Sequence, residues 1–195
     1  MSGWETLSGT AVALQQSNID TDQLIPARFM SQPRSAGYGG FLLHDVRAAQ
    51  DGHPLGQHKP KVLVTGRNFG SGSSREAAVY ALVDFGIKAV FAPSFGDIFM
   101  GNAVNNGLLA AQIGTDIASV LIAALGEDAG AAQVDLRTGR ATIAGQDVAF
   151  DLDPVSRQKL INGWDDIDMT LHHSEQIKAF RAARLAAHSW ALPAT

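Results

Sequence analysis

The chain has 195 residues and a formal net charge of −4, and 46% of its residues are hydrophobic. These values predict one domain with a sizeable core, and the absence of a basic block excludes general nucleic acid binding. There are no cysteines, so the chain can form no disulfide and supply no thiolate ligand to a metal. The N-terminus lacks a signal-peptide pattern and no apolar run has membrane-spanning length, so we expect a cytoplasmic protein without a membrane partner.

The N-terminal part combines one strand with long polar connections. Residues 10–16 (TAVALQQ) predict a strand. Residues 17–40 are rich in Asp, Pro and Gly and predict an ordered loop that becomes mobile toward its end. A short helix is expected within residues 41–50, and residues 51–60 predict a linker or surface loop.

The middle of the chain alternates strands and helices. Apolar strands are predicted at residues 61–66, 88–92 and 108–113. A helix follows each strand, and the first two are expected to stop at Gly86 and Gly107 because glycine commonly ends helices. Ser94 and Asp97 have the spacing of a start signal for the second helix. This alternation favours βαβ units and a parallel sheet.

The last third of the chain begins with a different pattern. Residues 132–150 predict short strands joined by turns at Thr138-Gly139 and Ala144-Gly145. Asp153 before Pro154 then predicts the capped start of a helix. Together with the preceding segments, these elements predict a single α/β domain with antiparallel hairpins over residues 1–195.

A C-terminal helix region is predicted at Ser174–Pro193. Its pattern is amphipathic, with apolar side chains at Ile177, Phe180 and Leu185. The simplest interpretation is a packing face, and a contact with an oligomer or partner is the alternative.

The stretch GRNFGSGSSREAA, residues 66–78, places Arg75 where a helix is expected to begin. A cation is unfavourable there, because the helix dipole is positive at its N-terminus. The stretch is no P-loop, since it lacks Gly-Lys-Ser/Thr, and Arg75 occupies the third glycine position of the dinucleotide fingerprint. An anion bound at the helix end would account for the arginine.

Two interpretations of this loop stay open. In the first, Ser73 and Glu76 form a capping box that contributes about 1 kcal/mol. In the second, Gly70 and Gly72 let the backbone approach a ligand, and Arg75 offers a bidentate fork to its carboxylate. The helix field also favours a deprotonated serine, so Ser73 could cap the resting helix and act as a base during turnover.

Four blocks of the chain resemble a known family. They are, in chain order, NIDTDQLIPARF, NFGSGSSRE, APSFGDIFMGNAVNNGLL and NGWDDIDMTL. They resemble the swivel domain of the aconitase superfamily in its stand-alone form, the small subunits of 3-isopropylmalate dehydratases. The resemblance covers nearly the whole chain and implies a single swivelling three-layer β/β/α domain of the aconitase C-terminal domain type.

The resemblance also implies an activity. The family forms heteromeric hydro-lyases that isomerise 2-isopropylmalate and 3-isopropylmalate through isopropylmaleate in leucine biosynthesis. A [4Fe-4S] cluster on the large subunit binds the substrate hydroxyl, and the small subunit holds no metal or cofactor. The expected partners are therefore a cluster-bearing large subunit and a di- or tricarboxylate substrate. A chain without cysteines is consistent with this division.

Residue by residue, the resemblance implies roles for the glycine-serine loop. Ser73 would be the base that removes the proton α to a carboxylate. Ser74 would donate a hydrogen bond to a substrate carboxylate, and Arg75 would form its salt bridge. Asp22 would lie beside the active site and orient a partner group, unless it only fixes its loop through an Asx-turn.

The loop Ser31–Gly40 is expected to be mobile and to help select the substrate. By the resemblance it supplies an arginine to the substrate, for which Arg34 is the first candidate and Arg28 the second. Ala77 stands where the family usually has histidine. This departure leaves room for a related substrate such as 2-methylmalate or homoaconitate. A non-catalytic anion-binding module, with Ser73 only a cap, is the alternative of a different class.

Overall fold

The computed structural model describes residues 2–191, and a seven-stranded sheet forms its centre. The strand order is β4-β3-β2-β1-β5-β6-β7. The strands are β1 (Thr6–Leu14), β2 (Val62–Thr65), β3 (Ala89–Ala92), β4 (Leu109–Gln112), β5 (Gly130–Asp135), β6 (Arg140–Ile143) and β7 (Gln146–Ala149). β1 to β4 are parallel, and β5 to β7 continue the sheet as antiparallel strands. The predicted parallel sheet with added hairpins is confirmed.

The helices occupy the connections between strands and the C-terminal region. They are α1 (Thr21–Leu24), α2 (His44–Ala49), α3 (Pro54–Gln57), α4 (Glu76–Phe85), α5 (Asp97–Asn105), α6 (Thr115–Leu125), α7 (Pro154–Asn162), α8 (Asp166–His172) and α9 (Ser174–Ala187). Short 3-10 turns lie at Ala27–Phe29, Arg34–Ala36, Tyr38–Phe41 and Ser189–Ala191. The short helix expected within residues 41–50 is α2, and the predicted linker contains the single turn α3.

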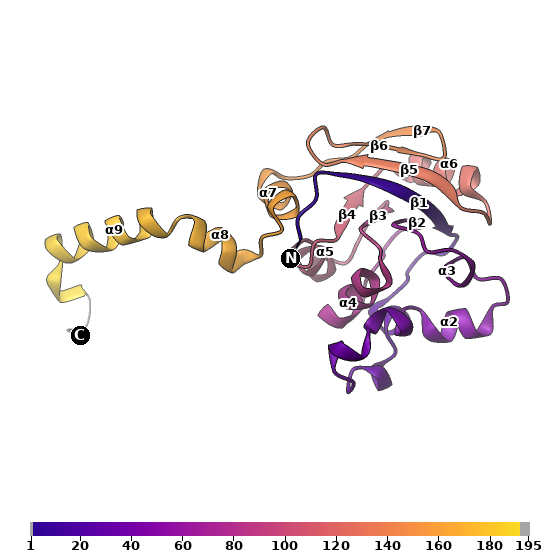
Figure 1. Ribbon diagram of the computed structural model, residues 1–195, viewed down its shortest axis with the longest axis horizontal. Coiled ribbons are helices and arrows are strands. Elements are labelled where there is room, and N and C mark those ends of the chain that lie inside the picture. Colours follow the sequence, from indigo (N-terminus) through magenta and orange to yellow (C-terminus); the bar gives the residue numbers. More distant parts are fainter. Residues whose placement is uncertain (1, 192–195) are drawn as a thin grey trace.

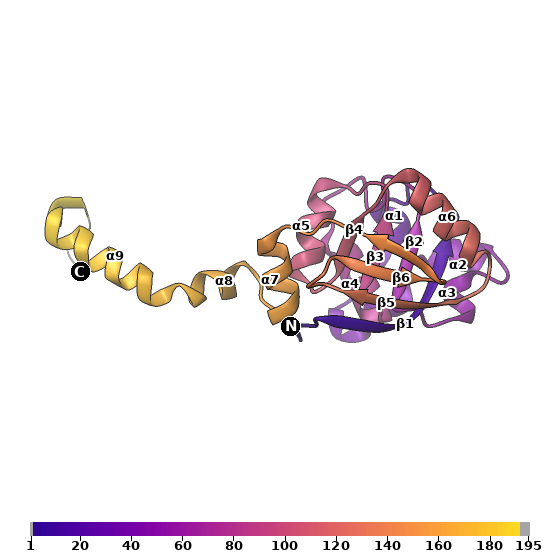
Figure 2. The same cartoon turned by 90° about the horizontal axis from the view of Figure 1, so that it is seen from above.

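Two apolar clusters fill the two faces of the parallel strands. Alternate residues of β1 divide between them, with Val12 and Leu14 in one cluster and Ala11 and Ala13 in the other. The first cluster packs the strands against α4 and α5. The second packs them against α6 and the antiparallel half of the sheet, which curls over them (Figures 1 and 2). The result is the expected three-layer β/β/α arrangement.

Helix ends show where local sequence signals hold. Gly86 ends α4 in the left-handed region at φ +111°, and Asp153 accepts hydrogen bonds from the first amides of α7, both as predicted. The start signal at Ser94 is wrong, because α5 begins after Gly96 without a side-chain cap. The Ser94 hydroxyl instead accepts a hydrogen bond from the amide of Asn68, at 2.8 Å. A contact between loops has replaced the local cap.

The C-terminal arm, residues 165–191, projects from the body of the molecule. It consists of α8, α9 and the last 3-10 turn, and it extends away from the sheet in both views (Figures 1 and 2). No residue of α8 or α9 is buried. The predicted helix region Ser174–Pro193 thus contains α9, and its final residues lie outside the described part of the chain. Within residues 2–191, no helix is long and apolar enough to span a bilayer.

Candidate functional site

The first three sequence blocks follow three neighbouring parallel strands. The block NIDTDQLIPARF comes after β1, NFGSGSSRE after β2, and APSFGDIFMGNAVNNGLL begins at the end of β3. The strands stand in the order β3-β2-β1, so their carboxyl ends lie side by side. In sheets of parallel strands this edge is where ligands commonly bind.

Backbone hydrogen bonds join the glycine-serine loop, residues 66–75, to the first block. The amide of Asn18 donates to the carbonyl of Arg67 at 2.8 Å. Further along, the amide of Gly70 donates to Ile19 at 2.7 Å, and the amide of Thr21 donates to Ser71 at 2.9 Å. The Gly70 amide is therefore used inside the protein and does not face a ligand, contrary to the sequence expectation.

Phe69 joins the same loop to the third block. Its amide donates to the carbonyl of Ser94 at 3.0 Å, and its carbonyl accepts from Gly96 at 2.9 Å. Its side chain is fully buried and contacts Phe95 and Phe99 edge-on. Segments of the chain that are distant in sequence thus hold the loop from both sides.

Gly70 is required by this packing. Its φ is +71°, in the region that side chains disfavour. A Cβ atom at this position would lie 2.3 Å from the ring of Phe99. The close approach between backbone and aromatic ring explains one glycine of the motif, whereas Gly72, also at positive φ, has only loose neighbours.

The predicted capping box is wrong. The N-cap of α4 is Arg75, and no side chain caps the helix. Ser73 lies two residues before the cap, where its carbonyl accepts a hydrogen bond from the Arg75 amide at 2.8 Å. The Glu76 carboxylate instead accepts a hydrogen bond from the side chain of Asn106. The helix therefore begins without a side-chain acceptor, and an incoming anion would meet free amides at its positive end.

Arg75 and Asp22 form an ion pair between the second and first blocks. The Arg75 side chain is 21% exposed and the Asp22 side chain 58% exposed, so the pair lies at the surface. The local capping bond in this segment is made by Asp20, the N-cap of α1, whose carboxylate accepts from the Gln23 amide at 2.8 Å. The contact that the structure gives the Asp22 carboxylate is the ion pair with Arg75, and its role as an orienting group stays a prediction.

Ser73 and Ser74 are exposed beside this pair. The structure thus brings Asp22 to Arg75 at one edge of the sheet, and Ser73 and Ser74 directly precede Arg75 in the chain. The arrangement offers two hydroxyls, an oriented cation and uncapped helix amides. Such a set can bind a carboxylate and stabilise developing negative charge on an oxygen atom.

Arg34 is not part of this group. Its guanidinium donates to Asp84 at 3.0 Å and lies over the ring of Tyr80, 3.9 Å from the centroid. Asp84 is in the last turn of α4, eight residues beyond the first, which corresponds to about 12 Å along the axis. Burial, with a hydrogen bond to Glu76 as a smaller cause, raises the pKa of the Tyr80 hydroxyl.

Arg28, the second candidate, is also paired. Its guanidinium forms an ion pair with Asp45 and lies 4.5 Å from the ring centroid of Phe29. The hydrogen bond from Arg28, with a smaller one from His44, holds the pKa of the Asp45 carboxyl well below its usual range. Neither arginine contacts the Ser73 group in this structure, so the substrate arginine stays a prediction.

The loop Ser31–Gly40 lies against α4. Tyr38 is buried, and its hydroxyl donates to the carbonyl of Gln32 at 2.8 Å. Gly39 packs on the backbone of Asp84 so closely that a Cβ would lie 2.6 Å from its carbonyl oxygen. These contacts and the Arg34 pair hold the loop at the C-terminal end of α4. The mobility expected from the sequence stays a prediction.

The fourth block is used elsewhere. Asp166, in NGWDDIDMTL, forms an ion pair with Lys159 and accepts a hydrogen bond from Asn105 at 2.9 Å. This cluster joins α5, α7 and α8 and does not reach Ser73. A cavity of about 980 Å³ opens beside it, with Lys159 and Asp166 in its lining and Ser73 outside it. The sequence analysis did not single out Lys159, because a lysine in the polar helix α7 carries no local signal of burial.

Comparisons with known proteins agree with this geometry. The pattern of the Aconitase C-terminal domain family matches residues 1–115. The chain is 38% identical to a 3-isopropylmalate dehydratase small subunit of Rhodospirillum centenum, over 98% of this chain and 100% of that protein. It is 40% identical to proteins of the same name from Frankia casuarinae and Shewanella oneidensis, with at least 90% of each chain covered.

A solved structure supports the fold. The crystal structure of a 3-isopropylmalate dehydratase from Methanocaldococcus jannaschii superposes with a TM-score of 0.66 and 24% identity, covering 90% of this chain and 99% of that one. The architecture, the sequence pattern and the near-complete coverage of the relatives lead to one assignment. The chain belongs to the aconitase C-terminal domain family, among the relatives of the 3-isopropylmalate dehydratase small subunits.

Proposed function

We propose that this chain is the small subunit of a hydro-lyase that interconverts 2-isopropylmalate and 3-isopropylmalate through isopropylmaleate in leucine biosynthesis. The observation that carries the proposal is the meeting of Ser73, Ser74, Arg75 and Asp22 at the carboxyl ends of β1 and β2. The names of the relatives support the substrate and the need for a large subunit.

In this proposal Arg75 binds a substrate carboxylate. Its guanidinium has a planar fork that suits a carboxylate, and the ion pair with Asp22 fixes its orientation before the substrate arrives. Ser74 donates a hydrogen bond to the same carboxylate. Arg34 or Arg28 would have to leave Asp84 or Asp45 to reach the substrate, so each pair defines a resting position of its arginine.

Ser73 removes the proton α to the carboxylate. A serine hydroxyl is a weak acid, so its alkoxide has to be stabilised by the site. The uncapped amides of α4 and the positive charge of Arg75 are the groups available for this. When water adds back to isopropylmaleate with the opposite orientation, the hydroxyl goes to the carbon that lost the proton, and the same serine can return the proton to the carbon that lost the hydroxyl.

The iron–sulfur cluster belongs to the large subunit in this proposal. The chain has no cysteine, and residues 2–191 hold no group of three or more side chains that could bind a metal ion. In this proposal the thiolate ligands come from the large subunit, and the cluster there would supply a Lewis acid for the substrate hydroxyl. A cytoplasmic location stays a prediction.

Anaerobic reconstitution tests the proposal. The chain is combined with a cluster-bearing large subunit, and formation of isopropylmaleate from 3-isopropylmalate is followed. Ser73→Ala should lower kcat by about 10³-fold or more, because a general base typically contributes 10² to 10⁴. Ser119→Ala, on exposed α6, is the matched control and should retain full activity.

Two outcomes would contradict parts of the proposal. Turnover of 2-methylmalate or homoaconitate in place of 3-isopropylmalate would assign a related substrate and direct attention to Ala77, which lies in the first turn of α4. Full activity of Ser73→Ala would remove the base assignment. Binding of a dicarboxylate by the chain alone, without turnover in any complex, would favour the anion-binding module.

A further inference from the structure

The C-terminal arm concentrates exposed apolar side chains. Within the described residues, six of the eleven strongly exposed large apolar side chains lie in it: Ile167, Leu171, Ile177, Phe180, Leu185 and Trp190. Phe180 is 68% exposed and Ile177 47% exposed. Exposed apolar groups gathered on one element mark a surface that another molecule covers. A 14-residue helix is also marginal in water by itself and gains from such a contact.

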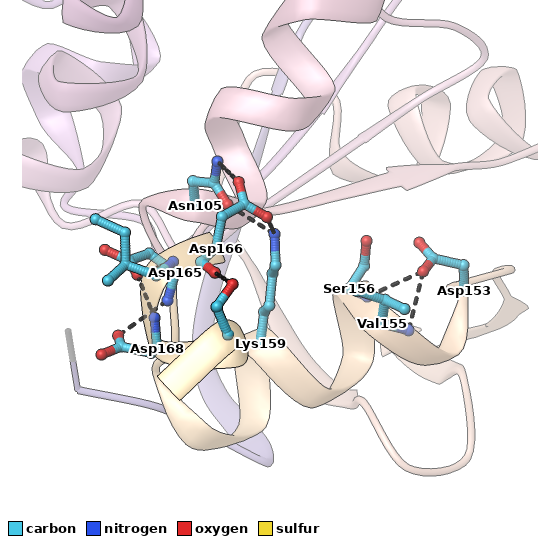
Figure 3. Close-up of polar contacts among 10 residues, drawn as sticks. Asn105, Asp153, Val155, Ser156, Lys159, Asp165, Asp166 and Asp168 are labelled. Atoms are coloured by element: carbon cyan, nitrogen blue, oxygen red, sulfur yellow. Dashed lines mark hydrogen bonds and ion pairs between the residues drawn. The ribbon is translucent and has the colours of Figure 1, made fainter. Parts of the chain in front are cut away.

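The root of the arm is built to hold it in one direction. Figure 3 shows Lys159 of α7 pointing at Asp166, the first residue of α8, and at Asn105 of α5. Lys159 is only 8% exposed, so the lysine end of this ion pair is packed in the body of the protein, whereas the Asp166 side chain stays exposed. Asp165 and Asp168 close a capping box at the same helix start. The projection is thus an anchored element of the fold.

The charge of α9 indicates the kind of surface that it fits. Lys178, Arg181 and Arg184 outnumber Glu175 on this helix. The other acidic residues of the arm, Asp165, Asp166 and Asp168, cap α8 or pair with Lys159 at its root. If two copies paired through α9, six cations would face two carboxylates, and like charges disfavour such a contact. The complementary surface is an apolar groove that also carries acidic side chains, on a different polypeptide.

The comparisons supply the identity of that polypeptide. A relative that is matched over its whole length, the arm included, has the name small subunit, which implies a larger partner chain. The family pattern at residues 1–115 ends well before the arm. We infer that the C-terminal arm is a docking element whose helix α9 binds an apolar groove with acidic side chains on the large subunit. This inference rests on the proposed function, because it takes the partner from it.

The test replaces three exposed apolar side chains of α9 and keeps the helix. Ile177→Gln, Phe180→Gln and Leu185→Gln are combined in one variant, since glutamine is a good helix former. Isothermal titration with the 3-isopropylmalate dehydratase large subunit of the same organism should give a Kd about 100-fold weaker than that of the wild-type chain. The control combines Ile117→Gln and Val120→Gln, which change two exposed apolar residues of α6, and should bind as the wild type does.

The possible results separate this inference from the proposed function. Wild-type affinity of the arm variant, or no binding by the wild-type chain, would overturn the docking role. So would an arm-dependent homodimer in sedimentation of the chain alone. At saturating large subunit the arm variant should recover the wild-type kcat, whereas Ser73→Ala should bind normally and stay inactive. Tight, arm-dependent binding without turnover would contradict the proposed function and still support the docking role.

Discussion

The glycine-serine loop and the C-terminal arm differ in how the rest of the chain holds them. The loop is held by segments on both sides, through backbone bonds to Ile19, Thr21, Ser94 and Gly96. The arm is held at its root by Lys159 and Asn105, and no residue of its helices α8 and α9 is buried. The contacts that hold the loop come from the same chain, whereas the exposed side chains of the arm are left for a contact with another molecule.

This difference separates two kinds of sequence motif. A motif that is packed on all sides, such as the segment around Phe69, cannot change without a loss of folding free energy. A motif on an exposed helix can change with little effect on folding, because its contacts form only in a complex. Measurements of folding stability therefore report on the packed loop, and measurements of binding report on the exposed arm.

The largest effect is expected where the loop packs most closely. Gly70→Ala should lower the free energy of unfolding by about 3 kcal/mol, since the new Cβ meets the Phe99 ring at a positive φ. Urea denaturation followed by circular dichroism measures the change. The matched control is Gly101→Ala in α5, where a Cβ meets nothing, and it should stabilise by about 0.5 to 1 kcal/mol. Equal stabilities of the two variants would contradict the packing argument.

A smaller effect is expected at the root of the arm. Lys159→Ala should lower the free energy of unfolding by about 2 kcal/mol, because it removes a buried stem and the ammonium that donates to both Asp166 and Asn105. Hydrogen exchange should accelerate in α8 and not in β1 to β4. Lys159→Met keeps the packing and removes the charge, so it should cost less. Unchanged exchange in α8 would mean that the cluster does not anchor the arm.

The smallest effect on stability is expected at the site itself. Asp22→Asn should leave the unfolding midpoint nearly unchanged, because its pair with Arg75 is exposed. The reconstituted enzyme should lose about tenfold or more in kcat/KM, since Arg75 is then less well oriented for a carboxylate. Asp20→Asn, which weakens the cap of α1, is the comparison variant. If Asp22→Asn lost stability and kept its activity, Asp22 would have a structural role only.

Local patterns predicted the elements but not their contacts. The strands, Gly86 and the cap at Asp153 follow from alternation and from residues within four positions along the chain. The start signals at Ser73 and Ser94 are wrong for one shared reason. Their loops form hydrogen bonds to neighbouring loops. Such contacts join residues far apart in sequence, so no local pattern in the sequence predicts them.

The candidate site was predictable to a similar extent. The resemblance named Ser73, Ser74, Arg75 and Asp22, and the structure gathers these residues at one edge of the sheet. It could not reveal that Asp22 pairs with Arg75 or that Arg34 pairs with Asp84, because side-chain partners depend on the packed positions of separate elements. Lys159 was missed because a single lysine in a polar helix gives no signal of burial.

The position of β1 has a consequence for synthesis of the chain. This first strand lies in the middle of the sheet, and its second neighbour, β5, comes more than 110 residues later. At typical translation rates the ribosome needs on the order of ten seconds to make that segment. During this time one edge of β1 has no strand beside it and is open to pairing with other chains. Slow elongation between β1 and β5 should therefore increase aggregation of the nascent chain more than delay at any later point.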